Sequence, residues 1–448
     1  MEPGRIFITS YEVLLMFMLE KAIVGGRKYW VWIGILLAVI AVAFGVYLRQ
    51  LNYGLGLTGM SRNISWGLYI GQFTFMVGVA ASAVMVVLPY YLHNHKEFSR
   101  MTILGEFLAV SAVTMCLLFI FVDMGQPMRV FNVILYPQPH SIMFWDMISL
   151  SGYLLLNATI TYFTLRAEQQ DVHYPHWLKY IILLSIPWAI SIHTITGFLY
   201  AGLPGRLAWR TAIMAPRFLA SAFAAGPALL ILLCLLLRQQ TGYNVGEKAI
   251  NGLSVIVTYA MVINVFFIAM EFFTAMYSRV PGLTEDFQDL YLGSVRTSLL
   301  PWGRTSLVLM AAALVFLLVP RLRHNEKGLA VACVLVFSSL WVDKGLCMVV
   351  GGFIPSPLGA ITRYVPTLPE MTITLGIWAV GALMVTVFYK IALSVEIAKE
   401  LSYVPAYEFA RTGGAVGLHA HSSSAVAGPG SGMAGRANEE VSGKGGDE

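Results

Sequence analysis

Acidic and basic side chains recur inside the long apolar stretches of this chain. A charge at membrane depth is costly, so such groups usually face a cavity or pair with another side chain. Carboxyl and imidazole groups take up and release protons, which is the chemistry of general acids and bases. The residues concerned are Glu106, Asp123, His140, Asp146, His193, Glu271, Asp343, Lys344 and Glu370. Carboxyl and imidazole side chains within apolar stretches therefore predict proton transfer inside the protein.

Composition predicts an all-α integral membrane protein with ten transmembrane helices over about residues 29–400. Of the 448 residues, 57% are hydrophobic and 12% are charged, whereas soluble domains carry about 25% charged residues. A span needs roughly 20 mainly apolar residues to cross about 30 Å of hydrocarbon. Ten stretches meet this requirement: about 30–50, 65–90, 102–122, 142–165, 178–200, 212–237, 250–277, 303–320, 328–350 and 371–394.

The two ends of the chain differ from this domain. Residues 1–28 are apolar but are interrupted by Glu12, Glu20 and Lys21, which favours an interfacial amphipathic helix over a removed signal peptide. Residues 401–448 are mostly small and polar. Such a segment does not bury enough apolar surface to fold, so a disordered tail is expected.

The distribution of lysine and arginine predicts the orientation in the membrane. The two ends and one set of connections hold 18 of these residues, and the other set of connections holds 10. By the positive-inside rule the richer side is cytoplasmic, which places both termini there and implies the cell's inner membrane. The outer connections are the longer ones; they form a platform for a partner protein or are merely long loops. The modest net charge of +5 does not indicate nucleic-acid binding.

This orientation places all but one of the ionisable groups near the outer face, and only Glu106 in the inner half. A polar-ended pocket there would suit a quinone head group, which needs hydrogen bonds to two carbonyls and groups that move two protons with two electrons. We predict that His140 and Asp146 bind the head group and handle its protons, with His193 beside them. The predicted proton-relay residues are Asp123, Glu271, Glu106 and Asp343.

Most of these residues also have a structural explanation. His193 could make an ordinary hydrogen bond between helices. Asp343 and Lys344 point about 100° apart on one helix, so each could pair with a different neighbouring helix. Asp123 and Glu370 could simply reach interfacial water.

Other signals in the sequence argue against several cofactors. Residues 54–59 match GxGxxG, but no strand precedes them, so we reject a dinucleotide site. The four cysteines form no CxxC pair, which argues against an iron–sulfur cluster, a structural zinc or another metal in this chain. His193 is the only histidine deep in a predicted span, which argues against haem held by two histidines.

Three short runs carry a resemblance to a known family. They are Gly59–Ile70 (GMSRNISWGLYI), Tyr136–Asp146 (YPQPHSIMFWD) and Ser191–Phe198 (SIHTITGF). These runs resemble the NrfD-like, or polysulfide-reductase-type, membrane subunits, and the resemblance covers about residues 30–400. Within that family the chain looks most like DsrP, the membrane subunit of a sulfite-reduction-associated complex.

The resemblance implies two four-helix bundles, about 65–200 and 212–350, with a peripheral helix pair. It implies transient binding of menaquinone or menaquinol, with no haem or iron–sulfur cluster in this chain. The implied partner is an outer-face ferredoxin-like iron–sulfur subunit, with a multihaem cytochrome c and a quinone-linked cytochrome b module as further expected partners. His140 and Asp146 would hold the quinone, and Trp66 and Tyr69 would lie near it or serve packing. A secondary transporter and a purely structural anchor are the alternative functions.

Overall fold

The computed structural model describes residues 20–402, except 21, 94, 171, 173, 294–299 and 360–361, and every regular element in them is a helix. The predicted interfacial segment lies mostly, and the predicted tail almost entirely, outside these residues. Within them, ten helices are long and apolar enough to cross a membrane, as the sequence predicts, and their ends differ from the predicted ones by a few residues. They are α2 (Arg27–Tyr53), α3 with α4 (Leu68–Ala80, Ser82–Leu92), α5 (Ser99–Asp123), α7 (Ile142–Gln169), α8 (His176–Ala201), α9 (Met214–Thr241), α10 (Glu247–Ser278), α12 (Leu300–Leu318), α14 continued by η6 and α15 (Glu326–Val342, Asp343–Met348, Val349–Gly351) and α16 (Leu368–Ser402).

Five connections meet at one end of these helices, which we call the long-loop face: 54–67, 124–141, 202–213, 279–293 and 352–367. Two contacts link parts of this face: the Gly59 N–H donates to Glu370 at the start of α16, and Arg206 donates to the carbonyl oxygen of Phe353. They contain the short elements η1 (Leu55–Leu57), η3 (Pro127–Phe131), α6 (Asn132–Leu135), η4 (Leu207–Trp209), α11 (Leu283–Phe287) and η5 (Gln288–Leu292). The opposite end carries η2 (Lys96–Phe98) and α13 (Pro320–Arg323). The long-loop face is the side predicted to be outer.

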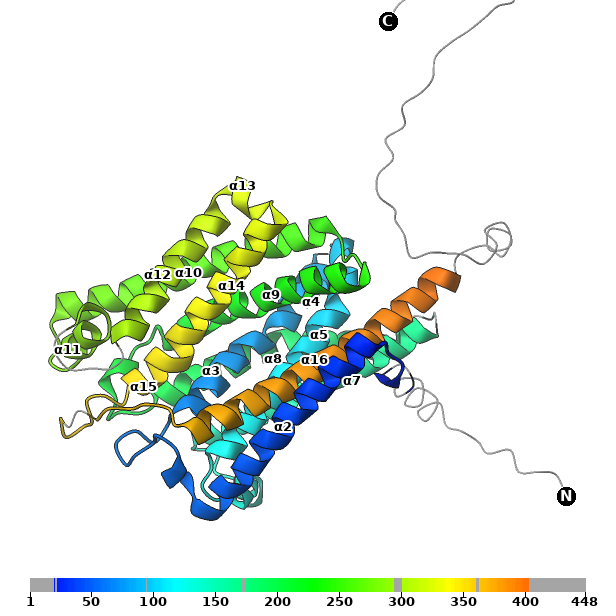
Figure 1. Ribbon diagram of the computed structural model, residues 1–448. Helices are drawn as coiled ribbons and strands as arrows, with labels where there is room; N and C mark the ends of the chain where they lie inside the picture. The colour runs from blue at the N-terminus through cyan, green and yellow to red at the C-terminus, as the bar shows by residue number, and fades with distance from the viewer. Residues whose placement is uncertain are drawn as a thin grey trace, which may run out of the picture. The chain divides into compact units, whose positions relative to one another are not determined.

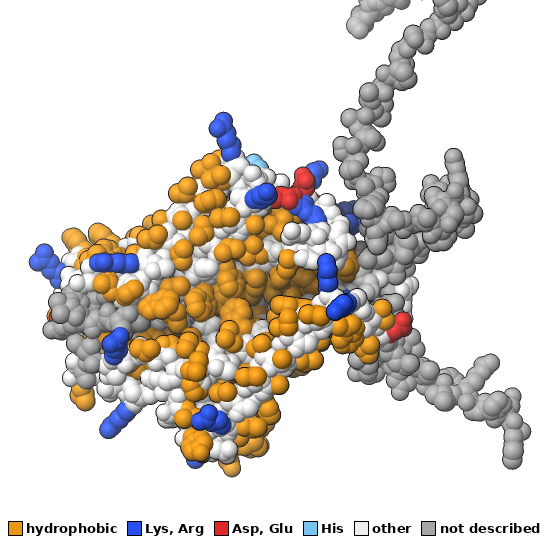
Figure 2. Space-filling view, in the orientation of Figure 1, with side chains coloured by type: hydrophobic (Ala, Val, Ile, Leu, Met, Phe, Trp, Pro, Cys, Tyr) orange, Lys and Arg blue, Asp and Glu red, His pale blue; other side chains and the backbone are white. Residues whose placement is uncertain are grey.

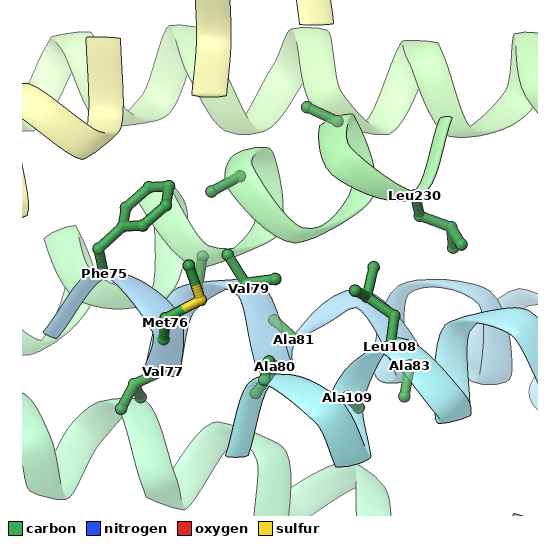
Figure 3. Packing of buried hydrophobic residues seen from close by; sticks show 14 of the residues in the cluster. Phe75, Met76, Val77, Val79, Ala80, Ala81, Ala83, Leu108, Ala109 and Leu230 are labelled. Carbon is green, nitrogen blue, oxygen red and sulfur yellow. The ribbon is translucent and has the colours of Figure 1, made fainter. Parts of the chain in front are cut away.

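Helix α3 is the centre of the packing, and every one of its residues is buried. Figure 3 shows its residues Phe75, Met76 and Val79 with the apolar side chains of neighbouring helices around them. Such close packing needs small residues, because two apolar helices gain contact energy in lipid only when their backbones approach. A Cβ on Gly71 would lie 1.8 Å from the carbonyl oxygen of Gly345, so α3 and η6 touch backbone to backbone.

The helices form two groups of neighbours around this centre. One group is α3, α4, α5, α7 and α8, and the other is α9, α10, α12 and α14. Helix α9 also packs on α3, α4 and α8, so neighbour contacts do not separate the groups cleanly, and the two-bundle arrangement stays a prediction. Outside both groups, α2 and α16 run side by side (Figure 1), and the Trp32 indole of α2 donates to Thr386 Oγ1 of α16 at 3.1 Å.

The outer surface of the helices is apolar. Exposed side chains on α2 include Val31, Ile35, Val42 and Phe44. Figure 2 shows hydrophobic side chains spread over the whole visible face, with most charged groups towards its edges. A soluble protein does not expose apolar area on this scale, so this surface suits contact with lipid.

Replacement of Gly71 by valine is expected to destabilise the protein, because the new side chain would collide with the Gly345 carbonyl. Overpacking of this kind costs about 1–3 kcal/mol. The measurement is the melting temperature of the purified protein in detergent. Gly45→Val on α2 is the matched control, since no atom lies within 4 Å of its Cβ position. Equal melting temperatures for the two variants would contradict the close contact of α3 and η6.

Candidate functional site

A buried polar stripe runs along one face of α8. It consists of His193, Thr196 and Tyr200, which are 1%, 0% and 0% exposed. The spacing of three and four residues places them on the same side of a helix. This side faces α3 and α7, so the stripe lies inside the protein and not toward lipid.

Asp146 on α7 is bound to the middle of this stripe. Its Oδ1 accepts a hydrogen bond of 2.8 Å from the Thr196 hydroxyl, and its side chain is 5% exposed. Among the described residues, no lysine, arginine or histidine forms an ion pair with Asp146. A buried carboxyl group that has a hydroxyl partner and no counter-ion is suited to hold a proton and release it.

An aromatic cluster closes the long-loop end of the stripe. Tyr200 bonds the Thr74 hydroxyl and packs edge-on against Trp66 and Trp209, at centroid distances of 5.5 and 5.0 Å. The two indoles stack at 5.9 Å, and Phe353 packs against both. Trp66, a predicted site residue, therefore lies one turn of α8 from the Asp146–Thr196 pair. Rings at this place would shield that pair from water.

A second polar group, the Arg217 cluster (Arg217, Glu271, Asp343 and Lys344), lies among α9, α10 and η6. Arg217 donates to Glu271 at 2.5 Å and to Asp343 at 2.7 Å. Lys344 donates to the carbonyl oxygen of Phe218 and lies 3.9 Å from the centroid of its ring. Arg217 is thus paired with two buried carboxylates, which is how buried ions become tolerable.

Arg217, which the orientation counts among the ten basic residues of the outer side, is 5% exposed and lies within the first turn of α9. Its pairing with both Glu271 and Asp343 makes these two carboxylates ion-pair partners, and their role in proton relay stays a prediction.

His193 is buried and lies one turn from Thr196 on α8. Its Nε2 is buried and has no hydrogen-bond partner among the described residues. The alternative explanation as a bonded helix–helix contact therefore does not apply to this nitrogen, which is available to a further group.

The remaining predicted residues lie apart from the Asp146–Thr196 pair. His140 is exposed in the 124–141 connection, so the predicted pair of His140 and Asp146 does not meet. Tyr69 donates to Gln50 Oε1 at 2.7 Å, in the packing of α3 on α2. Asp123 at the end of α5 has one buried oxygen without a partner in the described residues. Glu106 is 1% exposed in α5, and neither of its oxygens is bonded within the described part of the chain.

Glu370 holds the long-loop face together. Its carboxylate accepts hydrogen bonds from the backbone N–H groups of Gly59 and Leu68, both at 3.0 Å, and from the Tyr364 hydroxyl. It is 0% exposed, so the expectation that it reaches interfacial water is wrong. The physical reason is that the orphan N–H groups at the start of α3 need an acceptor.

Replacement of Glu370 by glutamine is expected to loosen residues 59–68, because the amide nitrogen cannot accept the bonds that the second carboxylate oxygen accepts. A buried donor left without its acceptor costs about 1–3 kcal/mol. Hydrogen exchange of the backbone amides of Gly59 and Leu68 is the measurement, with faster exchange expected. Thr372→Val, near the start of α16 on an exposed face, is the control. Unchanged exchange in the Glu370 variant would show that these bonds do not hold the loop.

The sequence model of the family described as "Polysulphide reductase, NrfD" matches residues 56–352. This chain belongs to the polysulphide reductase NrfD family. It is therefore a multi-pass integral membrane protein, and α2 and α16 lie outside the segment that defines the family match.

Relatives of this NrfD-family chain are membrane subunits of redox complexes. A putative dimethyl sulfoxide reductase membrane subunit of Halobacterium salinarum is 25% identical, over 79% of this chain and 89% of its own. The Hdr-like menaquinol oxidoreductase integral membrane subunit of Archaeoglobus fulgidus is 24% identical, over 81% and 93%. A menaquinone reductase integral membrane subunit of Nitratidesulfovibrio vulgaris is 23% identical, over 81% and 91%. The chain is thus similar to subunits of oxidoreductases over nearly their full length.

Thr196, Tyr200 and Trp209 of this candidate site are not among the residues predicted from the sequence. The sequence does contain a pattern that indicates Thr196 and Tyr200, because they follow His193 at helical spacing. Trp209 comes from η4, in a connection whose path no periodicity gives; its indole donates to the Met348 carbonyl at 2.8 Å. No group of three or more His, Cys, Asp or Glu within the described residues is placed to hold a metal ion.

Proposed function

We propose that this chain is the quinone-reactive membrane subunit of a multisubunit oxidoreductase. It would exchange electrons between menaquinol or menaquinone in the membrane and an iron–sulfur subunit on the long-loop face. The observation that carries the proposal is the Asp146–Thr196 pair, a buried carboxyl group without a cationic partner in the described residues. The names of two relatives, which contain menaquinol and menaquinone, support the substrate class.

The pair would serve the proton half of the reaction. Oxidation of a quinol releases two electrons and two protons, and reduction of a quinone takes up the same number. Asp146 would exchange a proton with the hydroxyl or carbonyl oxygen of the ring, and Thr196 would fix the direction of the carboxyl group. His193, one turn away with its Nε2 unbonded in the described part of the chain, would be the second proton-handling group.

The electron half needs a partner, and the 124–141 connection offers a surface for one. Exposed apolar side chains gather there on η3 and α6: Met128, Phe131, Ile134, Leu135 and Tyr136. An exposed apolar patch of this kind is typical of a protein interface. It would receive a ferredoxin-like iron–sulfur subunit, with His140 at its edge in contact with that subunit and not with the quinone.

Several finer assignments belong to the same proposal. Both termini would be cytoplasmic and the membrane would be the inner one, by the distribution of lysine and arginine. A multihaem cytochrome c and a cytochrome b module would complete the complex. The DsrP-type assignment, with its link to sulfite reduction, rests on the three sequence runs alone, and none of the relatives named above carries it.

A second candidate is an ion-translocating transporter. The Arg217 cluster favours it, because Asp343 and Lys344 lie in a π-helical segment, and irregular helix at membrane depth often marks a functional site. Both carboxylates of the cluster are already ion-paired with Arg217, which counts against a transported ion there.

Purification of the complex from native membranes separates the two functions. The oxidoreductase predicts that the chain isolates with subunits that contain iron–sulfur clusters, and that added menaquinol bleaches the cluster absorption. Isolation of the chain alone, together with ion flux in vesicles without quinone, would overturn the proposal in favour of the transporter.

A further inference from the structure

The carboxamide of Gln72 on α3 is fully buried, and only half of it is bonded within the described residues. Its Oε1 accepts hydrogen bonds from the indole N–H of Trp341 on α14 at 2.8 Å and of Trp378 on α16 at 3.0 Å. Two donors that meet one atom fix it as the oxygen, since the reversed amide would place donors against donors. The Nε2 therefore points elsewhere, and it has no partner in the described part of the chain.

A second buried polar atom without a partner lies on the same side of α16. It is the hydroxyl of Thr374, one turn before Trp378, which bonds nothing in the described part of the chain. A threonine in a helix commonly bonds the carbonyl four residues earlier, as Thr372 and Thr386 do in α16. Buried polar atoms are nearly always bonded, and each exception asks for an unseen partner. Thr374 is therefore a second buried polar group that needs a partner, one turn from the contact between Trp378 and Gln72.

Aromatic rings and an apolar surface surround this junction. Phe337 of α14 packs edge-on against Trp378, at 6.1 Å, and against Phe75 of α3, at 4.9 Å. Trp341 and Trp378 are partly exposed. Figure 2 shows an apolar hollow on this face, between the courses that α14 and α16 follow in Figure 1. A molecule that reaches Gln72 would therefore come from the lipid and lie against rings.

We propose that the junction of α3, α14 and α16 binds the ring of an isoprenoid quinone, whose carbonyl oxygen accepts a hydrogen bond from Gln72 Nε2. The unbonded amide N–H and the Thr374 hydroxyl suit an acceptor, and the indoles suit a flat ring. A phospholipid head group fits less well, because no lysine or arginine among the described residues bonds to Gln72, Trp341 or Trp378. The inference rests on the proposed function, since it assigns the same substrate class to a second place.

This junction is distinct from the Asp146–Thr196 pair. Gln72 and Thr74 are two residues apart on α3, so their side chains leave the helix about 200° apart. Thr74 faces Tyr200 on α8, and Gln72 faces α14 and α16. The junction also contains no carboxyl group or imidazole in these contacts, so it would bind a quinone without exchanging protons. Helix α16 lies outside the family match, so one wall of the junction is not part of the segment that the family model covers.

Photolabelling of the purified complex with an azido-menaquinone tests the assignment. The expected result is label on α14 and α16 peptides near Trp341 and Trp378, as well as on α7 and α8 peptides. Gln72→Leu should reduce label on α14 and α16 about 5- to 10-fold, the loss expected for one hydrogen bond, and should leave α7 and α8 labelled. Trp32→Phe on α2 is the matched control, because its indole is also near lipid and bonds α16.

The outcomes separate this inference from the proposed function. Label on α7 and α8 with none on α14 and α16 would overturn the second site alone. Label on neither would overturn both. Label on α14 and α16 that Gln72→Leu does not change, or that an azido-phospholipid reproduces and competes away, would assign the junction to ordinary lipid and overturn the inference.

Discussion

Asp146→Asn is expected to abolish quinone-linked electron transfer while the complex still assembles. The asparagine side chain has the same shape and still accepts the Thr196 hydrogen bond, so packing between α7 and α8 is kept. It cannot take up or release a proton, and loss of a positioned acid–base group typically costs about 10²- to 10⁴-fold in rate. The measurement is menaquinol-dependent reduction of the complex's metal centres, at equal complex content.

A matched variant separates proton transfer from positioning. Thr196→Val keeps the carboxyl group but removes the hydroxyl that bonds it, so a partial loss of rate is expected where Asp146→Asn gives a complete one. Normal turnover in Asp146→Asn would remove Asp146 from the reaction. Failure of the complex to assemble in Asp146→Asn would instead assign Asp146 a structural role.

Arg217→Met is expected to lose most of the folded protein. The substitution leaves Glu271 and Asp343 buried without the arginine that pairs with both. Breaking a buried ion pair by removing one partner costs about 3–5 kcal/mol, which is a large part of the roughly 5–15 kcal/mol that stabilises a typical protein. The measurements are the yield of folded protein in the membrane and its melting temperature in detergent.

A second substitution distinguishes the effect of unpaired charge from the effect of lost packing. In Arg217→Met with Glu271→Gln, only one buried carboxylate, Asp343, is left without the arginine, so part of the yield should return. Arg62→Met is the control, because that arginine is exposed on the long-loop face. If the double variant is no better than Arg217→Met, the loss comes from packing and not from unbalanced charge.

The spans could be predicted from the sequence because lipid imposes a simple rule. Each helix must be about 20 apolar residues long, and a stretch such as 142–165 satisfies the rule wherever it lies in the fold. The same rule identified Asp146, His193 and Glu271 as buried, since ionisable groups inside such a stretch are few. The burial of these three side chains could therefore be predicted before any of their contacts was known.

The partners of those groups could not be predicted in the same way. Arg217 looks like a loop charge because it is near the start of its span, and only the approach of α10 and η6 makes it the counter-ion of two acids. His140 and Asp146 are six residues apart, yet the connection ends between them and one side chain turns outward while the other turns inward. Nearness in sequence carries little information about contact where a loop meets a helix.

Gln72 is another residue whose burial follows from the sequence but whose contacts do not. Its position in the buried α3 is a direct consequence of the apolar sequence around it. That two tryptophans more than 250 residues away bond its oxygen depends on how α14 and α16 dock. The unbonded nitrogen is thus visible only in three dimensions.

The decisive observation is a density map of the intact complex with menaquinone bound. We expect the quinone ring among α3, α7 and α8, with one oxygen within hydrogen-bond distance of the Asp146 carboxyl group. A map in which the quinone ring lies elsewhere, while Asp146 stays bonded to Thr196 and enclosed by side chains, would contradict this expectation.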